Sequence, residues 1–255
     1  MPTLLSTLQA DVLTLALNRP ERANAFYVEM INELQNAFTK AEKNPQVRVI
    51  VLTGSGKAFS AGQDISEMKG SAISYREHLE KTYNPLIMQI RQIEKPVIAA
   101  VNGPCAGAAL GLALACDLRF ATDETKFVVG FSGIGLVPDS AVSLFLPALI
   151  GLGRAEEFYF SNAPISAQEA LEWGLVNGIF PATSFIQETL ASATQLATGS
   201  IGAFGLAKQA FNRAILPNLE DVLNTEADLQ EIAGKSAEHK EGIAAFLDKR
   251  KPKYI

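Results

Sequence analysis

The chain has 255 residues, of which 48% are apolar, and this is enough to bury the core of one large domain or two small ones. Its net charge is −5 and the basic residues are spread out, which argues against nucleic acid or an anionic membrane surface as a partner. Cys105 and Cys116 lie in an apolar stretch, so we expect buried, reduced thiols in a cytoplasmic protein.

The first half of the chain alternates strand patterns with helix patterns. Residues 3–18 predict a hairpin, and residues 28–43 predict an amphipathic helix with Met30, Ile31, Leu34, Phe38 and Ala41 on its apolar face. The elements predicted next are a strand at 47–52, a helix at 75–93, a strand at 97–101 and a helix at 106–115. The last of these is apolar on all sides, so we expect it in the centre of the fold.

An almost uncharged run from Pro96 to Cys116 has the length of a membrane span. Asn102, Gly103 and Pro104 interrupt it in the middle, and such residues favour a turn. We therefore predict a buried strand and a buried helix here, and no membrane segment.

The second half of the chain is mostly helical. Strands are predicted at 118–121 and 126–129, and the segment from Ile134 to Ser140 leads into an apolar helix at 141–149. From Arg154 onward the predicted helices are 167–173, 186–197, 203–215, 221–233 and 239–249. This order indicates an α/β fold of stacked β/α units, in one continuous domain with a core over 1–195 and a helical zone over 196–255 that forms a cap or an assembly surface.

Two glycine- and alanine-rich bends carry the most chemical information. One lies in Lys57-Ala-Phe-Ser-Ala-Gly-Gln-Asp-Ile-Ser-Glu-Met68, and the other in Asn102-Gly-Pro-Cys-Ala-Gly-Ala-Ala-Leu-Gly111. Bends of this kind can direct backbone N–H groups at an oxyanion, and in acyl chemistry the loss of one such donor costs roughly 10²–10³ in rate.

Other catalytic motifs are incomplete. The bend at Gly54 follows a strand, but Val51 and Ala58 stand where a phosphate-binding loop needs Gly and Ser or Thr. Ser132 lacks the second glycine of a nucleophile elbow. His78 and His239 are both expected on helix surfaces, which argues against a Ser–His pair, and no cluster of residues has metal-ligand spacing.

Motifs along nearly the whole chain resemble the crotonase family, the enoyl-CoA hydratases and isomerases. They include Asn18-Arg-Pro-Glu-Arg-Ala-Asn-Ala25, Phe59-Ser-Ala-Gly-Gln-Asp-Ile65, Lys95-Pro-Val-Ile-Ala-Ala-Val-Asn-Gly103 and Glu241-Gly-Ile-Ala-Ala-Phe-Leu-Asp-Lys-Arg250. The resemblance implies an α/β spiral of ββα units with a helical C-terminal trimerisation zone. It also implies homotrimers or homohexamers, an acyl-CoA substrate, and neither a metal nor a separate cofactor.

The resemblance also implies roles for particular residues. The backbone N–H groups of Gln63 and Ala108 would polarise the thioester carbonyl, so that side-chain identity there matters little. The residues expected to bind CoA or the acyl group are Ala23, Ala25, Ala61, Asp64, Ile65, Gly107, Gly111, Phe131 and Pro138. Phe246 and Lys249 match residues that reach the CoA of a neighbouring subunit, although Lys249 can also be read as a solvated charge at a helix C-terminus.

The chain departs from the family's hydratases at two positions. Their two catalytic glutamates correspond to Gly111 and Phe131, whereas several isomerases keep one carboxylate at the place of Asp139. Phe131, Val137 and Leu144 are expected to form an apolar pocket that raises the pKa of Asp139 into the range useful for proton transfer. Alternatively, Asp139 is only the N-cap of the helix that follows.

The resemblance is closest to the phenylacetate-pathway acyl-CoA isomerases, in Ala61-Gly-Gln-Asp64, Tyr83-Asn-Pro-Leu86 and Ile134-Gly-Leu-Val-Pro-Asp139. Ala108-Ala109 and Ala141 depart from it, because glycines are usual there. The sequence thus favours an isomerase that moves a double bond, or isomerises a ring epoxide, through an enolate with Asp139 as acid and base. The alternatives are a hydratase-like enzyme, a dehalogenase or hydrolase with Asp139 as nucleophile, and an acyl-CoA-binding protein without activity.

Overall fold

The computed structural model describes residues 2–68 and 73–254, and a large mixed sheet runs through its centre. Within these residues the sheet has the strand order β1-β2-β3-β4-β6-β9. β1 (Leu4–Gln9) and β2 (Val12–Leu17) form the predicted hairpin. The parallel strands are β2, β3 (Val49–Gly54), β4 (Val97–Val101), β6 (Leu118–Thr122) and β9 (Gly178–Phe180). The predicted α/β class is confirmed.

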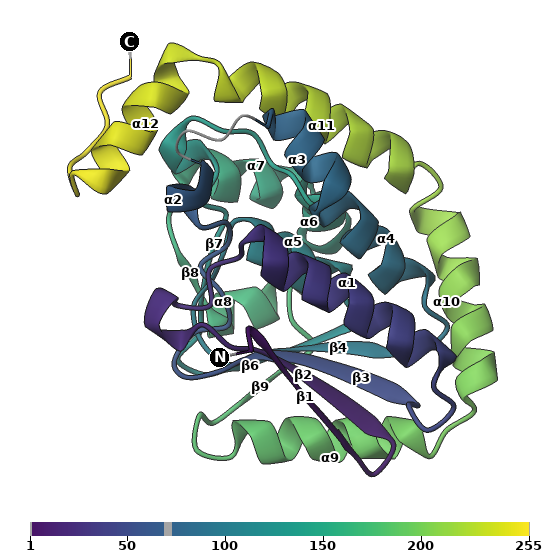
Figure 1. Ribbon diagram of the computed structural model, residues 1–255. Helices are drawn as coiled ribbons and strands as arrows, with labels where there is room; N and C mark the ends of the chain where they lie inside the picture. Colours follow the sequence, from purple (N-terminus) through teal and green to yellow (C-terminus); the bar gives the residue numbers. More distant parts are fainter. Residues whose placement is uncertain (1, 69–72, 255) are drawn as a thin grey trace.

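Helices cover both faces of this sheet. On one face, Val49, Val51 and Ile98 pack against α9 (Phe185–Ala197). On the other face, the alternate side chains form a continuous core with α1 (Val28–Lys43), α4 (Tyr83–Gln92) and α5 (Ala108–Ala115). Figure 1 shows α9 below the sheet and the other three helices above it. Burial on both faces is typical of parallel sheets.

The predicted amphipathic helix is confirmed, since α1 has the expected bounds and buries the five expected residues. The predicted helix at 75–93 is instead two helices, α3 (Tyr75–Lys81) and α4, separated at Thr82 with φ −116° and ψ −80°. Pro85 has no N–H to donate within a continuous helix, but the first turn of a new helix tolerates it.

The second glycine-rich bend begins with a strand. Cys105 and Ala106 form β5, which pairs with β7 (Lys126–Val128), and β7 pairs with β8 (Ile165–Ser166). The helix predicted at 106–115 therefore begins only at Ala108, after Gly107 with φ 58° and ψ −132°. A positive φ of this kind strains any residue with a Cβ, which explains the glycine.

The remaining elements surround this core. They are η1 (Pro20–Arg22), α2 (Ile65–Met68), η2 (Ser132–Ile134), α6 (Val142–Ile150), α7 (Leu152–Ser161), α8 (Ala167–Glu172), α10 (Ile201–Ile215), α11 (Leu219–Gly234) and α12 (Ala237–Leu247). The sequence named no element at η1, α2, η2, β8 or β9, and it named no separate helix at α7 within the half of the chain that was expected to be mostly helical. β8 and β9 have two and three residues, which is too short for a period of two to be recognised.

The C-terminal helices wrap around one side of the molecule, and α12 packs on η2 of the same chain (Figure 1). The approach is backbone to backbone: a Cβ at Gly242 would lie 2.6 Å from the carbonyl carbon of Ile134. A Cβ at Gly135, which has φ +67°, would lie 2.8 Å from the carbonyl carbon of Glu238 and from the backbone nitrogen of His239. Helix α12 thereby forms part of the wall of a cavity in its own chain.

Candidate functional site

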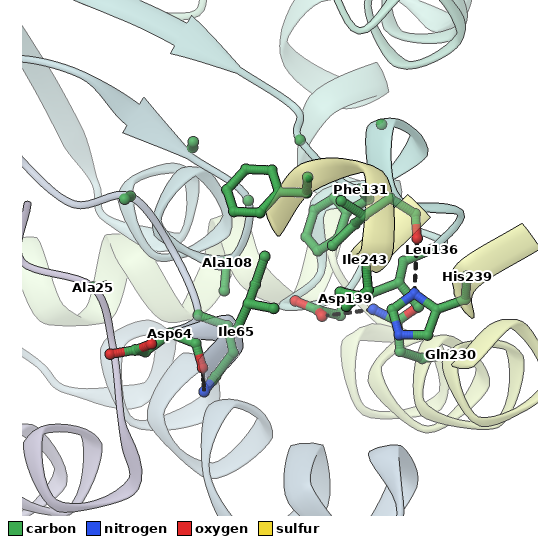
Figure 2. A pocket seen from close by; sticks show the side chains of 18 of the residues that line it. Ala25, Asp64, Ile65, Ala108, Phe131, Leu136, Asp139, Gln230, His239 and Ile243 are labelled. Atoms are coloured by element: carbon green, nitrogen blue, oxygen red, sulfur yellow. Dashed lines mark hydrogen bonds between the residues drawn. The ribbon is translucent and has the colours of Figure 1, made fainter. Parts of the chain in front are cut away.

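A cavity of about 570 Å³ lies between the two glycine-rich bends, α3, α11 and α12. Its wall is mainly apolar with a few polar groups, which is the usual character of a small-molecule site. The predicted site residues on this wall are Ala25, Ala61, Gln63, Asp64, Ile65, Gly107, Ala108, Phe131, Asp139 and Phe246. Figure 2 shows Ala25 and Asp64 at one end, and Asp139, Gln230 and His239 together at the other.

The two bends lie directly against each other. Ser60 pairs with Cys105, and the backbone N–H of Ala106 donates to Ser60 O at 3.1 Å. Gly62 has φ +84°, and a Cβ there would lie 2.6 Å from Ala106 O and 3.4 Å from Ala108 N. Only glycine therefore permits this approach, which places the Gln63 turn next to the first residue of α5.

Hydrogen bonds fix the direction of the backbone at Gln63. Phe26 N donates to Gly62 O at 2.7 Å, and Asp64 N donates to Phe26 O at 2.8 Å. Because successive N–H groups of extended backbone point to opposite sides, the N–H of Gln63 points away from Phe26. Ala108 is the first residue of α5, so its N–H has no acceptor within the helix.

The Gln63 side chain is also held in place, although its identity was expected to matter little. Its Oε1 accepts from Nε2 of His78 at 3.0 Å and from the hydroxyl of Tyr83 at 2.5 Å. Its Nε2 donates to Asp64 O at 3.3 Å, which defines the orientation of the amide.

Asp139 is a buried carboxyl at one end of the cavity, with 6% of its surface exposed. Its Oδ1 accepts from the Ser140 hydroxyl at 2.8 Å. Its Oδ2 accepts from Nε2 of Gln230 at 2.9 Å, as Figure 2 shows. Burial raises the pKa of Asp139 to about 6, against the opposing effect of these two hydrogen bonds. The pKa of Asp139 is thus raised, as expected. Of the three residues expected to form the apolar pocket, Phe131 lines the cavity, whereas Leu136 lines it in place of Val137 and Leu144.

Asp139 is not the N-cap of the following helix, so that alternative is wrong. Glu226 on α11 occupies the end of α6 instead: its Oε2 accepts from Ala141 N at 2.7 Å, and its Oε1 accepts from the N–H and hydroxyl of Ser143. Burial raises the pKa of Glu226 as well, and the nearby Asp139 charge adds to that rise. Ser140 and Ala141 have φ values of 57° and 61°, a left-handed turn that side chains disfavour.

Both histidines lie on the cavity wall rather than on the helix surface, so that prediction is wrong as well. Nδ1 of His239 lies 2.7 Å from Ile134 O, and since a carbonyl can only accept, this nitrogen carries the proton. Nε2 of neutral His239 therefore accepts from the Tyr75 hydroxyl, 2.6 Å away. Burial lowers the pKa of His239 and favours this neutral form.

Four predicted site residues are not on the cavity wall. Ala23 and Lys249 are exposed, although Ala23 O accepts from the backbone N–H of Ala61 at the rim. Pro138 is half-buried beside Asp139, and Gly111 is buried under Ser140. Phe246, expected to reach a neighbouring subunit, lines the cavity of its own chain because α12 packs on η2.

Comparison with known proteins identifies the family of this chain. A family model described as enoyl-CoA hydratase/isomerase matches residues 7–255. The chain belongs to the enoyl-CoA hydratase/isomerase family. It is 38% identical over 258 residues to the 1,2-epoxyphenylacetyl-CoA isomerase of Escherichia coli (strain K12), which covers 100% of this chain and 98% of that protein.

Two further relatives show how varied this family is. The chain is 36% identical over 225 residues to the 4-chlorobenzoyl coenzyme A dehalogenase-2 of Arthrobacter sp, covering 87% of this chain and 81% of the relative. It is similar in structure to an enoyl-CoA hydratase from Mycobacterium avium subsp. paratuberculosis K-10, with a TM-score of 0.91, 33% identity and coverage of 100% and 99%. The expected family and crotonase fold are confirmed, whereas the reaction varies among these relatives.

Gly111, which the resemblance aligns with a glutamate of the hydratases, has little room for a side chain. A Cβ at Gly111 would lie 2.5 Å from Cβ of Ser140 and 3.1 Å from a methyl group of Val142, so the Asp139–Ser140 turn fills the space of a side chain.

Across residues 2–68 and 73–254, no helix is long and apolar enough to cross a membrane.

Proposed function

We propose that this enzyme isomerises an acyl-CoA thioester through an enolate. The N–H groups of Gln63 and Ala108 hold the thioester oxygen, and the Asp139 carboxyl moves a proton between the α and γ carbons of the acyl group. The main support for this proposal is that Asp139 is buried at one end of an apolar cavity. Burial raises the pKa of its carboxyl to about 6, where the group can both take up and release a proton. The reaction is redox-neutral, and it calls for no metal or electron-transferring cofactor.

The CoA part of the substrate is expected at the end of the cavity near Ala25 and Asp64. Arg22 also lines this end and supplies a positive charge for an anionic ligand. Asp64 is engaged locally, since Arg19 forms an ion pair with it at 3.2 Å and the Ser66 hydroxyl donates to it. The acyl group would then extend between Phe131 and Leu136 toward Asp139.

The test compares the wild type with Asp139→Asn, using a 3-enoyl-CoA and following its conversion to the 2-enoyl isomer by ultraviolet absorbance. Removal of an acid/base group is expected to lower kcat by about 10²–10⁴ with substrate binding retained. Asp123→Asn is the matched control, because Asp123 does not line the cavity and its Oδ1 accepts from Ala182 N, and the kcat of this variant should equal that of the wild type. Undiminished isomerisation by Asp139→Asn would contradict the proposal.

A second candidate follows from the similarity to the dehalogenase and from the buried carboxylate. In it, the Asp139 carboxylate attacks the ring carbon that carries the chlorine of 4-chlorobenzoyl-CoA, chloride leaves, and an aryl ester of Asp139 is formed. Acid quenching of a single turnover with 4-chlorobenzoyl-CoA, followed by mass spectrometry of the peptide around Asp139, distinguishes the two. A mass increase at Asp139 would favour the nucleophile over the proton shuttle.

We also propose a homotrimer or homohexamer. The support is a group of exposed apolar side chains on α10, where Leu206, Phe211 and Ile215 are between 62% and 68% exposed. Light scattering of the wild type, and of a variant with Phe211→Lys, tests this assembly. The wild type is expected at a multiple of three chains and the variant at a lower mass.

A further inference from the structure

Two hydrogen-bond donors on different helices meet at one atom of Gln63. Nε2 of His78, on α3, and the hydroxyl of Tyr83, at the start of α4, both donate to Oε1 of Gln63. His78 and Tyr83 are 8% and 2% exposed, so water cannot readily replace this acceptor for both of them. A buried donor that loses its acceptor destabilises the folded protein, which makes other positions of the Gln63 side chain unfavourable.

The two donors are themselves fixed by packing. The rings of His78 and Tyr83 form an edge-to-face pair at 5.6 Å, and the ring of Phe26 lies 6.0 Å from that of Tyr83. The Thr82 hydroxyl donates to His78 O at the break between α3 and α4. Phe26 also pairs with Gln63 through the backbone, so Phe26, Tyr83 and Gln63 each contact the other two.

Gln63 is consequently held through both its main chain and its side chain. Its main chain is tied to Phe26 on either side, at Gly62 O and at Asp64 N, and its side chain is tied at Oε1. A donor that stabilises an oxyanion is effective only if its direction is set before the reaction begins. Rotation of the Gln63 peptide would require that at least one of these attachments break.

We propose that His78 and Tyr83 are positioning residues that direct the Gln63 N–H at the thioester oxygen by holding the side-chain oxygen of Gln63. This inference rests on the proposed oxyanion role of Gln63. It differs from the role of Asp139, because it concerns carbonyl polarisation and not proton transfer. It also gives the Gln63 side chain a role in positioning, although only the backbone N–H of Gln63 would contact the thioester oxygen.

A double-mutant cycle in kcat is the first test, with Tyr83→Phe, Gln63→Met and the double variant. Tyr83→Phe keeps the ring and removes the hydroxyl, and we expect kcat to fall about tenfold, less than the roughly 10²–10³ caused by loss of an oxyanion donor. In the Gln63→Met background the same change should have no further effect, because its acceptor is already gone. An equal fall in both backgrounds, or no fall in either, would overturn the inference.

Two matched variants separate positioning from stability. His78→Gln retains an N–H donor and should keep more of kcat than His78→Leu. Tyr159→Phe removes a comparable hydroxyl bond, to Leu136 O, from a residue that is not on the cavity wall, and it should lower Tm without lowering kcat. If kcat instead follows Tm across all these variants, His78 and Tyr83 have only a structural role.

The second test requires no turnover. Butyryl-CoA labelled with ¹³C at the thioester carbon cannot isomerise, and its carbonyl stretching frequency on the protein reports polarisation of that bond. The wild type should lower this frequency, and Tyr83→Phe and Gln63→Met should lower it less. A shift in the wild type that both variants retain would overturn the positioning role alone, whereas no shift in the wild type would contradict the oxyanion role in the proposed function.

Discussion

Glu226 and Gln230 lie one turn apart on α11 and hold the two sides of the Asp139 turn. Glu226 accepts from Ala141 and Ser143, after the turn, and Gln230 donates to Asp139 itself. Oε1 of Gln230 also accepts from Val137 N at 3.1 Å, which orients its amide. A C-terminal helix therefore fixes the position and the hydrogen bonding of the carboxyl group in the middle of the chain.

The first prediction concerns Glu226→Gln. Both carboxylate oxygens of Glu226 accept hydrogen bonds, whereas glutamine has one acceptor and would turn an N–H₂ toward a backbone donor. We expect the free energy of unfolding to fall by about 1–3 kcal/mol, measured with urea. Glu220→Gln, at an exposed site on the same helix, should change it by less than about 0.5 kcal/mol. Equal stabilities of the two variants would show that Glu226 does not hold the turn.

The second prediction concerns the pH dependence of the reaction. Asp139 must be ionised to take a proton, so kcat/KM for a 3-enoyl-CoA should decline as the pH falls below about 6. The hydrogen bond from Gln230 lowers the pKa of Asp139, and its removal should raise that value. We therefore expect Gln230→Leu to move the acidic limb of the profile to higher pH. A limb that stays in place would mean that another group controls it.

The third prediction concerns stability. The folded pKa of Asp139 lies above the unfolded value of 3.8, so the folded protein holds this proton more tightly. The resulting stabilisation is complete below pH 3.8 and is lost as the pH rises through about 6. A difference of about two pKa units corresponds to about 3 kcal/mol.

Urea unfolding of the wild type and of Asp139→Asn at pH 4, 5.5 and 7 measures this loss. Between the first and last of these pH values, the wild type should lose up to about 3 kcal/mol relative to the variant. Parallel pH curves for the two proteins would contradict burial as the cause of the raised pKa.

Much of the fold could be predicted from local sequence patterns. The apolar period of α1 identifies its bounds and its buried face, because one side of that helix packs on a sheet and the other faces solvent. β4 lies where its uninterrupted apolar run predicted it, since it is buried on both faces. Asp139 could be identified by its position in a family motif, without knowledge of its hydrogen-bond partners.

The rest of the site depends on contacts between residues distant in sequence. Glu226 follows Ala141 by 85 residues, and no local pattern indicates that it ends α6. His239 stands between Glu238 and Lys240, and His78 follows Glu77, so charged neighbours suggested exposed helix faces. Only the packing of α3 and α12 around the cavity shows that the histidines occupy the buried sides of these helices.

The last prediction concerns Gly111, at the place of a hydratase glutamate. Its Cβ position overlaps Ser140 of the turn that carries Asp139, so Gly111→Glu should not produce a hydratase. Gly111→Ala isolates the effect: the gain in helix propensity of about 1 kcal/mol is opposed by overpacking of about 1–3 kcal/mol. We expect Tm to fall, and isomerase activity to fall with it as the turn moves.

Gly153→Ala is the control for this change, because nothing lies within 4 Å of its Cβ position in α7. Without overpacking, alanine should leave Tm unchanged or raise it slightly, through the lower entropy of the unfolded chain. Hydration of a 2-enoyl-CoA by a folded Gly111→Glu protein would show that the turn can yield. In that case the packing of Ser140 would not be what prevents hydration, and the absence of the glutamate alone would explain it.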